Sequence, residues 1–128
     1  MTRDELIAYI SDEYSVVPDH PFPRDGETCV FRHLNNRKWF ALVMRIPYRT
    51  LGVDRDGGAD VVNLKCDPLI AGPLRGKPGF YPAYHMNKDK WITVLLDGSA
   101  SRGDIVALLA MSHTLTARRP RRKKEENA

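Results

Sequence analysis

Apolar positions recur every three or four residues near both ends of the chain, which is the spacing of helices that bury one face. At the N-terminal end, Thr2 and Glu5 have the spacing of a capping box, and the apolar pattern continues to Tyr14. At the C-terminal end, Ser101 and Asp104 can cap a second helix. Its predicted buried face consists of Ile105, Leu108, Leu109, Ser112 and Leu115. The pattern therefore predicts a first helix that runs to about residue 14 and a long helix that ends where the basic C-terminal segment begins.

Between these helices, polar and apolar residues alternate as they do in half-buried strands. Segments 28–34 and 37–46 flank Asn35 and Asn36, which tolerate positive φ, so they predict a β-hairpin. Two further strands are predicted over residues 61–66 and 90–96.

A short helix is predicted to begin at Asp67-Pro68, since Asp accepts backbone N–H bonds at a cap and Pro suits the first helical position. We expect Gly72-Pro73 to interrupt this helix. The order of the elements predicts an α+β fold with two layers, in which helices pack on one side of a mostly antiparallel sheet.

A regular two-residue turn would fix the register of the hairpin and so the face on which each side chain lies. It places Arg32 opposite Trp39, Phe31 opposite Phe40, and Cys29 opposite Leu42. The face predicted to pack on a helix consists of Cys29, Phe31, Phe40, Leu42, Met44 and Ile46. The opposite face would combine Arg32, Arg37, Trp39 and Arg45 with Val30, Ala41 and Val43, and would be joined by Asn63 and Lys65. The sequence thus predicts a sheet face that mixes cations with an indole.

Two segments near the middle of the chain are specific enough to indicate a family. These are Val62-Asn63-Leu64-Lys65-Cys66-Asp67-Pro68 and Ala83-Tyr84-His85-Met86-Asn87-Lys88, the second followed closely by Trp91 and then by Leu96-Asp97-Gly98-Ser99. They resemble the signature of the MmcQ/YjbR family of small bacterial proteins. The resemblance implies a two-layer fold similar to that of type III secretion chaperones, with DNA binding proposed and no established catalytic residues. The family usually continues the helix through the position of Gly72-Pro73, so this chain departs from its pattern there.

Positive charge is concentrated at the C-terminal end. Residues 118–128 hold six of the 20 basic residues but only two of the 16 acidic ones, so residues 1–117 carry 14 of each and are formally neutral. The six cations are Arg118, Arg119, Arg121, Arg122, Lys123 and Lys124. The segment contains Pro120 and no large apolar side chain that could anchor it. We therefore predict one domain over residues 1–117 and a flexible basic tail over residues 118–128.

Composition excludes several classes of protein. No apolar run approaches the roughly 20 residues that span a bilayer, which predicts no integral membrane segment. The polar N-terminus lacks the layout of a secretory signal, so we expect a cytoplasmic protein. Cys29 and Cys66 are too few for a disulfide framework or a zinc site, and we expect both to be buried, reduced thiols.

The charge pattern favours nucleic-acid binding, to either DNA or RNA. The tail cations could each neutralise one phosphate, although a solvated tail that only aids solubility fits the same pattern. A second contribution could come from the mixed sheet face, where indoles beside cations suit single-stranded bases. The candidates on this face are Arg32, Trp39, Arg45, Lys65 and Trp91. The alternative is an ordinary cross-strand cation–π pair between Arg32 and Trp39.

Two other roles remain open. His85, Asn87 and Lys88 lie on a predicted turn, where they could bind a small anion or could satisfy backbone groups of the loop. The protein could also be an interaction module for another protein, as a monomer or as a weak homodimer seeded by the outer-face residues Val30, Ala41 and Val43.

Catalysis, metals and cofactors have little support in the sequence. Cys66 and His85 are a thiol and an imidazole that could meet, but no acid is evident that would orient the base. The histidines at positions 20, 33, 85 and 113 lack the i, i+3 or i, i+4 spacing of metal ligands. We therefore predict a protein without cofactor, metal or enzymatic activity.

Overall fold

The computed structural model describes residues 1–117. The tail residues 118–128, including the six cations predicted to contact phosphates, lie outside the described residues. The elements in chain order are α1 (Arg3–Tyr14), β1 (Cys29–Arg32), β2 (Trp39–Pro47), the 3₁₀ turn η1 (Tyr48–Leu51), β3 (Gly58–Lys65), α2 (Pro68–Leu74), β4 (Phe80–Pro82), β5 (Trp91–Leu95) and α3 (Arg102–Thr116).

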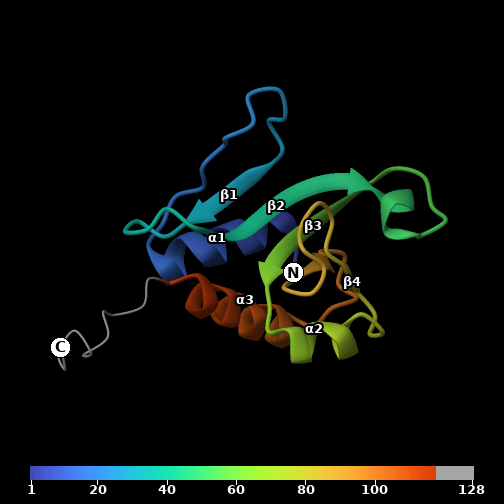
Figure 1. Cartoon of the computed structure of the whole chain (residues 1–128). Helices are drawn as coiled ribbons and strands as arrows, with labels where there is room; N and C mark the ends of the chain where they lie inside the picture. The colour runs from blue at the N-terminus through green and yellow to red at the C-terminus, as the bar shows by residue number, and fades with distance from the viewer. Residues whose placement is uncertain (118–128) are drawn as a thin grey trace.

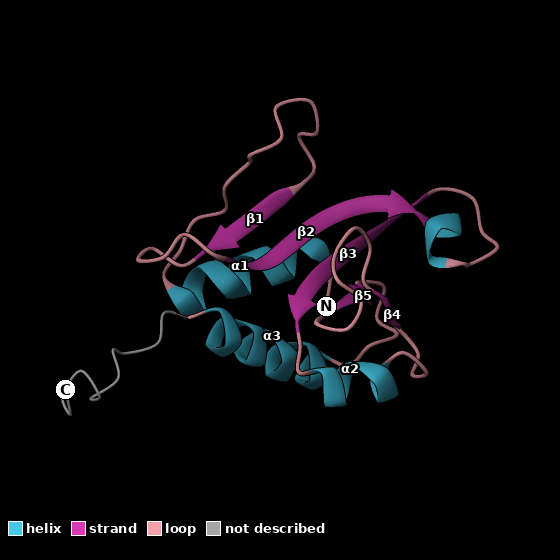
Figure 2. Ribbon diagram, in the orientation of Figure 1, coloured by secondary structure: helices cyan, strands magenta, loops and turns pink. Residues whose placement is uncertain are grey.

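The strands form one antiparallel sheet in the order β1-β2-β3-β5-β4, and α1 and α3 lie side by side on one of its faces (Figures 1 and 2). This arrangement confirms the predicted α+β fold. The loop between β4 and β5 crosses the opposite face in front of β3, as the yellow segment of Figure 1 shows. The sequence pattern had indicated neither the short strand β4 nor the turn η1.

The predicted helix starts are confirmed by their caps. The Thr2 hydroxyl accepts from the Glu5 amide at 3.2 Å while the Glu5 carboxylate accepts from the Thr2 amide at 2.8 Å. The Asp67 carboxylate accepts from the Leu69 amide, and Ser101 accepts from the Asp104 amide.

Two details of the helix predictions are wrong. Helix α2 continues through Gly72-Pro73 to Leu74. In so short a helix Pro73 forfeits only the hydrogen bond to the carbonyl of Leu69, whose side chain is 85% exposed. In α3, Thr116 is buried whereas Leu115 is 43% exposed, because the position four residues after Ser112 continues the buried stripe.

Of the pairs that a two-residue turn predicts, which also include Leu34 opposite Arg37, the sheet contains only one. Arg32 does lie opposite Trp39, but Phe31 pairs with Ala41 and Cys29 with Val43, so Phe40 is an extra residue in β2. The turn is also longer than two residues, because the His33 amide donates to the Lys38 carbonyl across it. A bulge of one residue reverses the alternation of every side chain that follows it.

The bulge exchanges the two faces of β2. Ala41 and Val43 join the core between sheet and helices, together with Phe40, while Leu42, Met44 and Ile46 lie on the opposite face. The helix-side core also holds Cys29, Phe31, Val62, Leu64, Cys66, Ile92 and Val94. The predicted helix-facing set was therefore half wrong, and Ala41, Val43 and the fully buried Val30 are not available to seed a dimer.

The face away from the helices is apolar and largely covered, in contrast to the mixed polar face that was predicted. The buried apolar residues on this face are Val30, Leu42, Met44, Ile46, Ala59, Val61 and Leu95. Asn63 also lies on this face and is fully buried. Its side-chain amide is satisfied there, since Nδ2 donates to the Tyr84 carbonyl at 2.8 Å and Oδ1 accepts from the Thr93 hydroxyl at 2.5 Å. The loop between β4 and β5 is thus fastened onto the sheet by Asn63.

Candidate nucleic-acid interface

Two of the predicted nucleic-acid contacts are occupied by acidic partners. The Arg32 Nε donates to Asp19 Oδ2 at 2.9 Å, and its guanidinium lies 5.4 Å from the centre of the Trp39 ring. The Arg45 Nη1 donates to Asp60 Oδ1 at 3.1 Å across β2 and β3. Both charges are therefore partly neutralised, and Arg32 forms the cross-strand cation–π pair that was the alternative interpretation.

The other three predicted residues come together at one end of the sheet. Trp39, Lys65 and Trp91 lie on the adjacent strands β2, β3 and β5, and Lys65 is directly opposite Trp91. They line a shallow depression of about 400 Å³, which we call the basic depression, together with Arg37, Lys38 and Thr116. No carboxylate of residues 1–117 lines it, and none of its three cations forms an ion pair within the same residues.

The long turn between β1 and β2 supplies two of these cations. Arg37 has a positive φ of 63°, and the Asn36 side chain accepts from the Lys38 amide at 2.8 Å. The same Asn36 donates through Nδ2 to the Thr116 carbonyl at 2.9 Å. The turn is therefore tied to the last turn of α3, and Lys38, which regular alternation would direct away from the mixed face, reaches the basic depression instead.

Ser112 on α3 explains how the edge of the sheet is held in place beneath the basic depression. Its hydroxyl donates to the Phe40 carbonyl at 2.6 Å, at the bulge, and accepts from the Lys65 amide at 2.8 Å, at the end of β3. Both backbone groups lie where the strand pairing is interrupted, so without Ser112 they would be unpaired in a buried site.

A pair of histidines lies behind the same turn. The rings of His33 and His113 are 4.4 Å apart between their centres, and His113 also stacks on Tyr14 at 4.4 Å and contacts Phe40. His33 Nε2 is 2.8 Å from the Thr116 hydroxyl. Burial lowers the pKa of both imidazoles below the ordinary value, and His33 lowers the pKa of His113 further. The sequence did not predict the contact between His33 and His113, because 80 positions separate them.

Two of the three residues of the predicted turn, Asn87 and Lys88, bond to backbone groups of the same loop. The Asn87 side chain accepts from the Asp89 amide at 2.8 Å, and Lys88 Nζ donates to the Ala83 carbonyl at 2.9 Å. His85 has a positive φ of 58° and an exposed ring. Cys66 lies in the helix-side core, on the other face of the sheet from His85, so this thiol and imidazole do not meet. Burial also raises the pKa of the Cys66 thiol, with Asp67 adding to the effect.

His85 instead borders a cleft that the sequence did not predict. This apolar cleft, of about 430 Å³, lies on the sheet face away from the helices and is lined by Phe22, Asp25, Thr28, Trp39, Leu42, Met44, Tyr84, His85 and Met86. Trp39 lines both the apolar cleft and the basic depression. The only hints in the sequence were the aromatic and methionine residues of loops 21–28 and 84–86.

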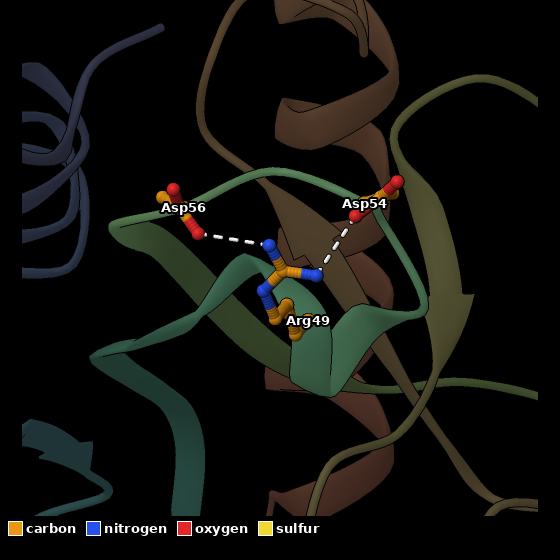
Figure 3. A network of polar contacts seen from close by, with 3 residues as sticks. All are labelled: Arg49, Asp54 and Asp56. Carbon is orange, nitrogen blue, oxygen red and sulfur yellow. Dashed lines mark hydrogen bonds and ion pairs between the residues drawn. The ribbon is translucent and has the colours of Figure 1, made fainter.

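A separate polar network lies in the loop between η1 and β3. Arg49 donates to Asp54 and to Asp56, each at 2.8 Å (Figure 3). These bonds raise the pKa of the already basic Arg49 further and close a loop whose two carboxylates are almost fully exposed. Arg49 is thus another cation engaged by acids rather than available to phosphate.

The same fold occurs in known relatives. The model of the YjbR family matches residues 12–115, which is most of the chain. This chain belongs to the YjbR family. The chain is also similar to the uncharacterised protein YyaQ of Bacillus subtilis, with 34% identity over 91% of this chain and 98% of YyaQ.

Solved structures agree with this assignment. A crystal structure of a Pseudomonas syringae protein is 46% identical, covers 91% of this chain and all of that one, and superposes with a TM-score of 0.90. A solution NMR structure from the same organism gives 44% identity and a TM-score of 0.85 over 95% of this chain and 98% of that one. Protein DR2400 of Deinococcus radiodurans is 30% identical, with a TM-score of 0.69 over 98% of this chain and 86% of that one. Across residues 1–117, no helix has the length and apolar character needed to cross a membrane.

Proposed function

We propose that this YjbR-family protein binds nucleic acid through the basic depression, with the cations of residues 118–124 adding contacts to phosphates. The observation that carries the proposal is the convergence of Arg37, Lys38 and Lys65 around two indoles, in a surface that no carboxylate of residues 1–117 lines. Grooves that bind single strands combine these two features, since cations neutralise phosphates and aromatic rings stack on bases.

The distribution of charge supports this location. Within residues 1–117, which are formally neutral, Arg32, Arg45 and Arg49 are each held by an acid, whereas Arg37, Lys38 and Lys65 form no ion pair. Thr116, which lines the basic depression, is followed within two residues by the most basic segment of the chain. A strand held at the basic depression would therefore lie near Thr116, two residues before that segment begins.

The absence of enzymatic activity and a cytoplasmic location are parts of the same proposal. Two free, buried thiols suit a reducing compartment. Burial raises the pKa of both Cys29 and Cys66, which disfavours the nucleophilic thiolate. The outcome that would overturn this part is turnover of a nucleic-acid substrate by the purified chain.

Fluorescence anisotropy with labelled single-stranded DNA, RNA and duplex DNA tests the proposal. The full chain and a chain that ends at Ala117 are compared at about 50 and 200 mM salt. We expect the full chain to bind at the lower salt, and the shorter chain to retain weaker binding that prefers single strands. If the full chain binds none of the three probes at about 50 mM salt, the proposal is wrong and the search moves to protein partners.

A further inference from the structure

The apolar cleft has the shape and chemistry of a small binding pocket. Its volume of about 430 Å³ lies within the range of roughly 300–1,000 Å³ found for pockets that bind small molecules. Leu42 and Met44 of β2 are nearly buried at its base, and Phe22 meets Trp39 edge to face with 6.1 Å between ring centres. Aromatic and thioether groups of this kind suit a flat ring.

The apolar cleft and the basic depression share one lining residue, Trp39. This indole lines both, and it directly follows Lys38, a cation of the basic depression. A ligand that spans the two must therefore carry negative charge next to a flat ring. Each nucleotide of a single strand has this combination, with its phosphate beside its base.

Charge determines which part of the nucleotide enters each site. Asp25 is the ionisable acid at the apolar cleft, and hydrogen bonds from Thr28 and from backbone amides lower its pKa, so it stays charged at neutral pH. A phosphate would be repelled there and attracted to Lys38 and Lys65. The exposed His85 ring makes no side-chain hydrogen bond within residues 1–117, so it is available to the polar edge of a base.

We infer that the apolar cleft receives one unpaired nucleobase of a strand whose phosphates lie at the basic depression. The inference rests on the proposed function and narrows it to single strands. In a duplex the bases are stacked and paired, and turning one outward costs a few kcal/mol before it can enter a pocket.

The two tryptophans of the chain allow a direct test. In full-length W91F, Trp39 is the sole indole, and it lines the proposed base site. Its fluorescence is titrated with an unlabelled strand of about ten thymidines and with a strand of the same length that has abasic sites throughout. We expect both strands to bind the wild-type chain in competition anisotropy, but only the thymidine strand to quench Trp39 in W91F.

Two results would overturn the inference in distinguishable ways. If the strands bind but change Trp39 emission equally, the base does not enter the apolar cleft, although the proposed function stands. If neither strand binds the wild-type chain, which keeps both indoles of the basic depression, the proposed function fails together with the inference.

Phe22→Ala tests the wall of the apolar cleft, with Leu69→Ala as the control. Phe22 is 42% exposed in a loop, and Leu69 is an exposed residue of α2 that does not line the site. We expect F22A to weaken binding of the thymidine strand about threefold to tenfold, as the loss of one aromatic contact implies. The affinity for the abasic strand should stay unchanged. L69A should change neither. Equal losses for both strands in F22A, or no loss for the thymidine strand, would contradict a base in the apolar cleft.

Discussion

Removal of two cations from the basic depression should reduce the salt dependence of binding by a calculable amount. Lys38→Gln and Lys65→Gln together keep a flexible polar side chain, one atom shorter than that of Lys, while removing two of the three charges that line it. Arg37 is left in place because its φ of 63° makes the backbone there sensitive to substitution. Lys65 contributes its backbone amide to Ser112, and the substitution preserves that bond.

The magnitude follows from counterion release. Each phosphate contact contributes about 0.7 to the slope of log affinity against log salt for a single strand. Nine cations, three at the basic depression and six in residues 118–124, would give a slope of about −6.3, and the double variant one of about −4.9. At the depression alone, a change from about 50 to 200 mM salt should weaken binding about 20-fold in the wild type and about threefold in the variant.

The assay is anisotropy of a labelled single strand across four or more salt concentrations. Lys77→Gln is the matched control, because Lys77 is exposed and does not line the basic depression. A slope that stays at the wild-type value in the double variant, or one that falls equally per charge in K77Q, would refute the assignment of phosphate contacts to Lys38 and Lys65.

Three further predictions concern the structure that supports the site. Because the folded-state pKa values of His33 and His113 lie below their unfolded values, the unfolded chain binds more protons, so stability should fall as pH drops below about 6.5. The urea midpoint should then be lower near pH 5.5 than near pH 7.5, and equal midpoints would contradict it. Asn63→Ala leaves a buried loop carbonyl without its donor and should lower the free energy of unfolding by about 1–3 kcal/mol in urea denaturation. Ser112→Ala unpairs two backbone groups and should lower the free energy of unfolding by at least as much, about 1–3 kcal/mol or more. An unchanged urea midpoint would show that water replaces the hydroxyl.

Local signals in the sequence predicted the helices well. Thr2, Glu5, Asp67 and Ser101 all cap helices through bonds that span two or three residues, so the sequence contains both partners at a recognisable spacing. The family signature in the sequence likewise indicated the α+β fold. The pairing of residues at the edges of the sheet depends on partners that are far away in the sequence, and the predictions were less accurate there.

The bulge at Phe40 illustrates the limit. No residue near Phe40 signals an extra position, and the carbonyl is satisfied by Ser112, 72 residues later in the chain. A missed bulge exchanges the two faces of a strand, which is why Leu42, Met44 and Ile46 were assigned to the wrong side. The apolar cleft was missed for the same reason, since two of these residues line it.

The candidate site was predicted in part. Trp39, Lys65 and Trp91 do converge, because strand order alone brings them to one end of the sheet. The ion pairs of Arg32 and Arg45 were not foreseen, because their acidic partners, Asp19 and Asp60, lie 13 and 15 residues away and charge counting does not show which cations are paired.

The most direct test of the account is a map of where nucleic acid contacts the protein. The full-length protein, labelled with ¹⁵N, is titrated with a single strand of about ten nucleotides, and amide and indole N–H shifts are followed by NMR. We predict that the largest shifts occur at Lys38, Lys65 and both tryptophan indoles, with the exposed side of α1 unaffected. Shifts that leave both indoles and these two lysines unchanged while residues elsewhere respond would contradict the central claim.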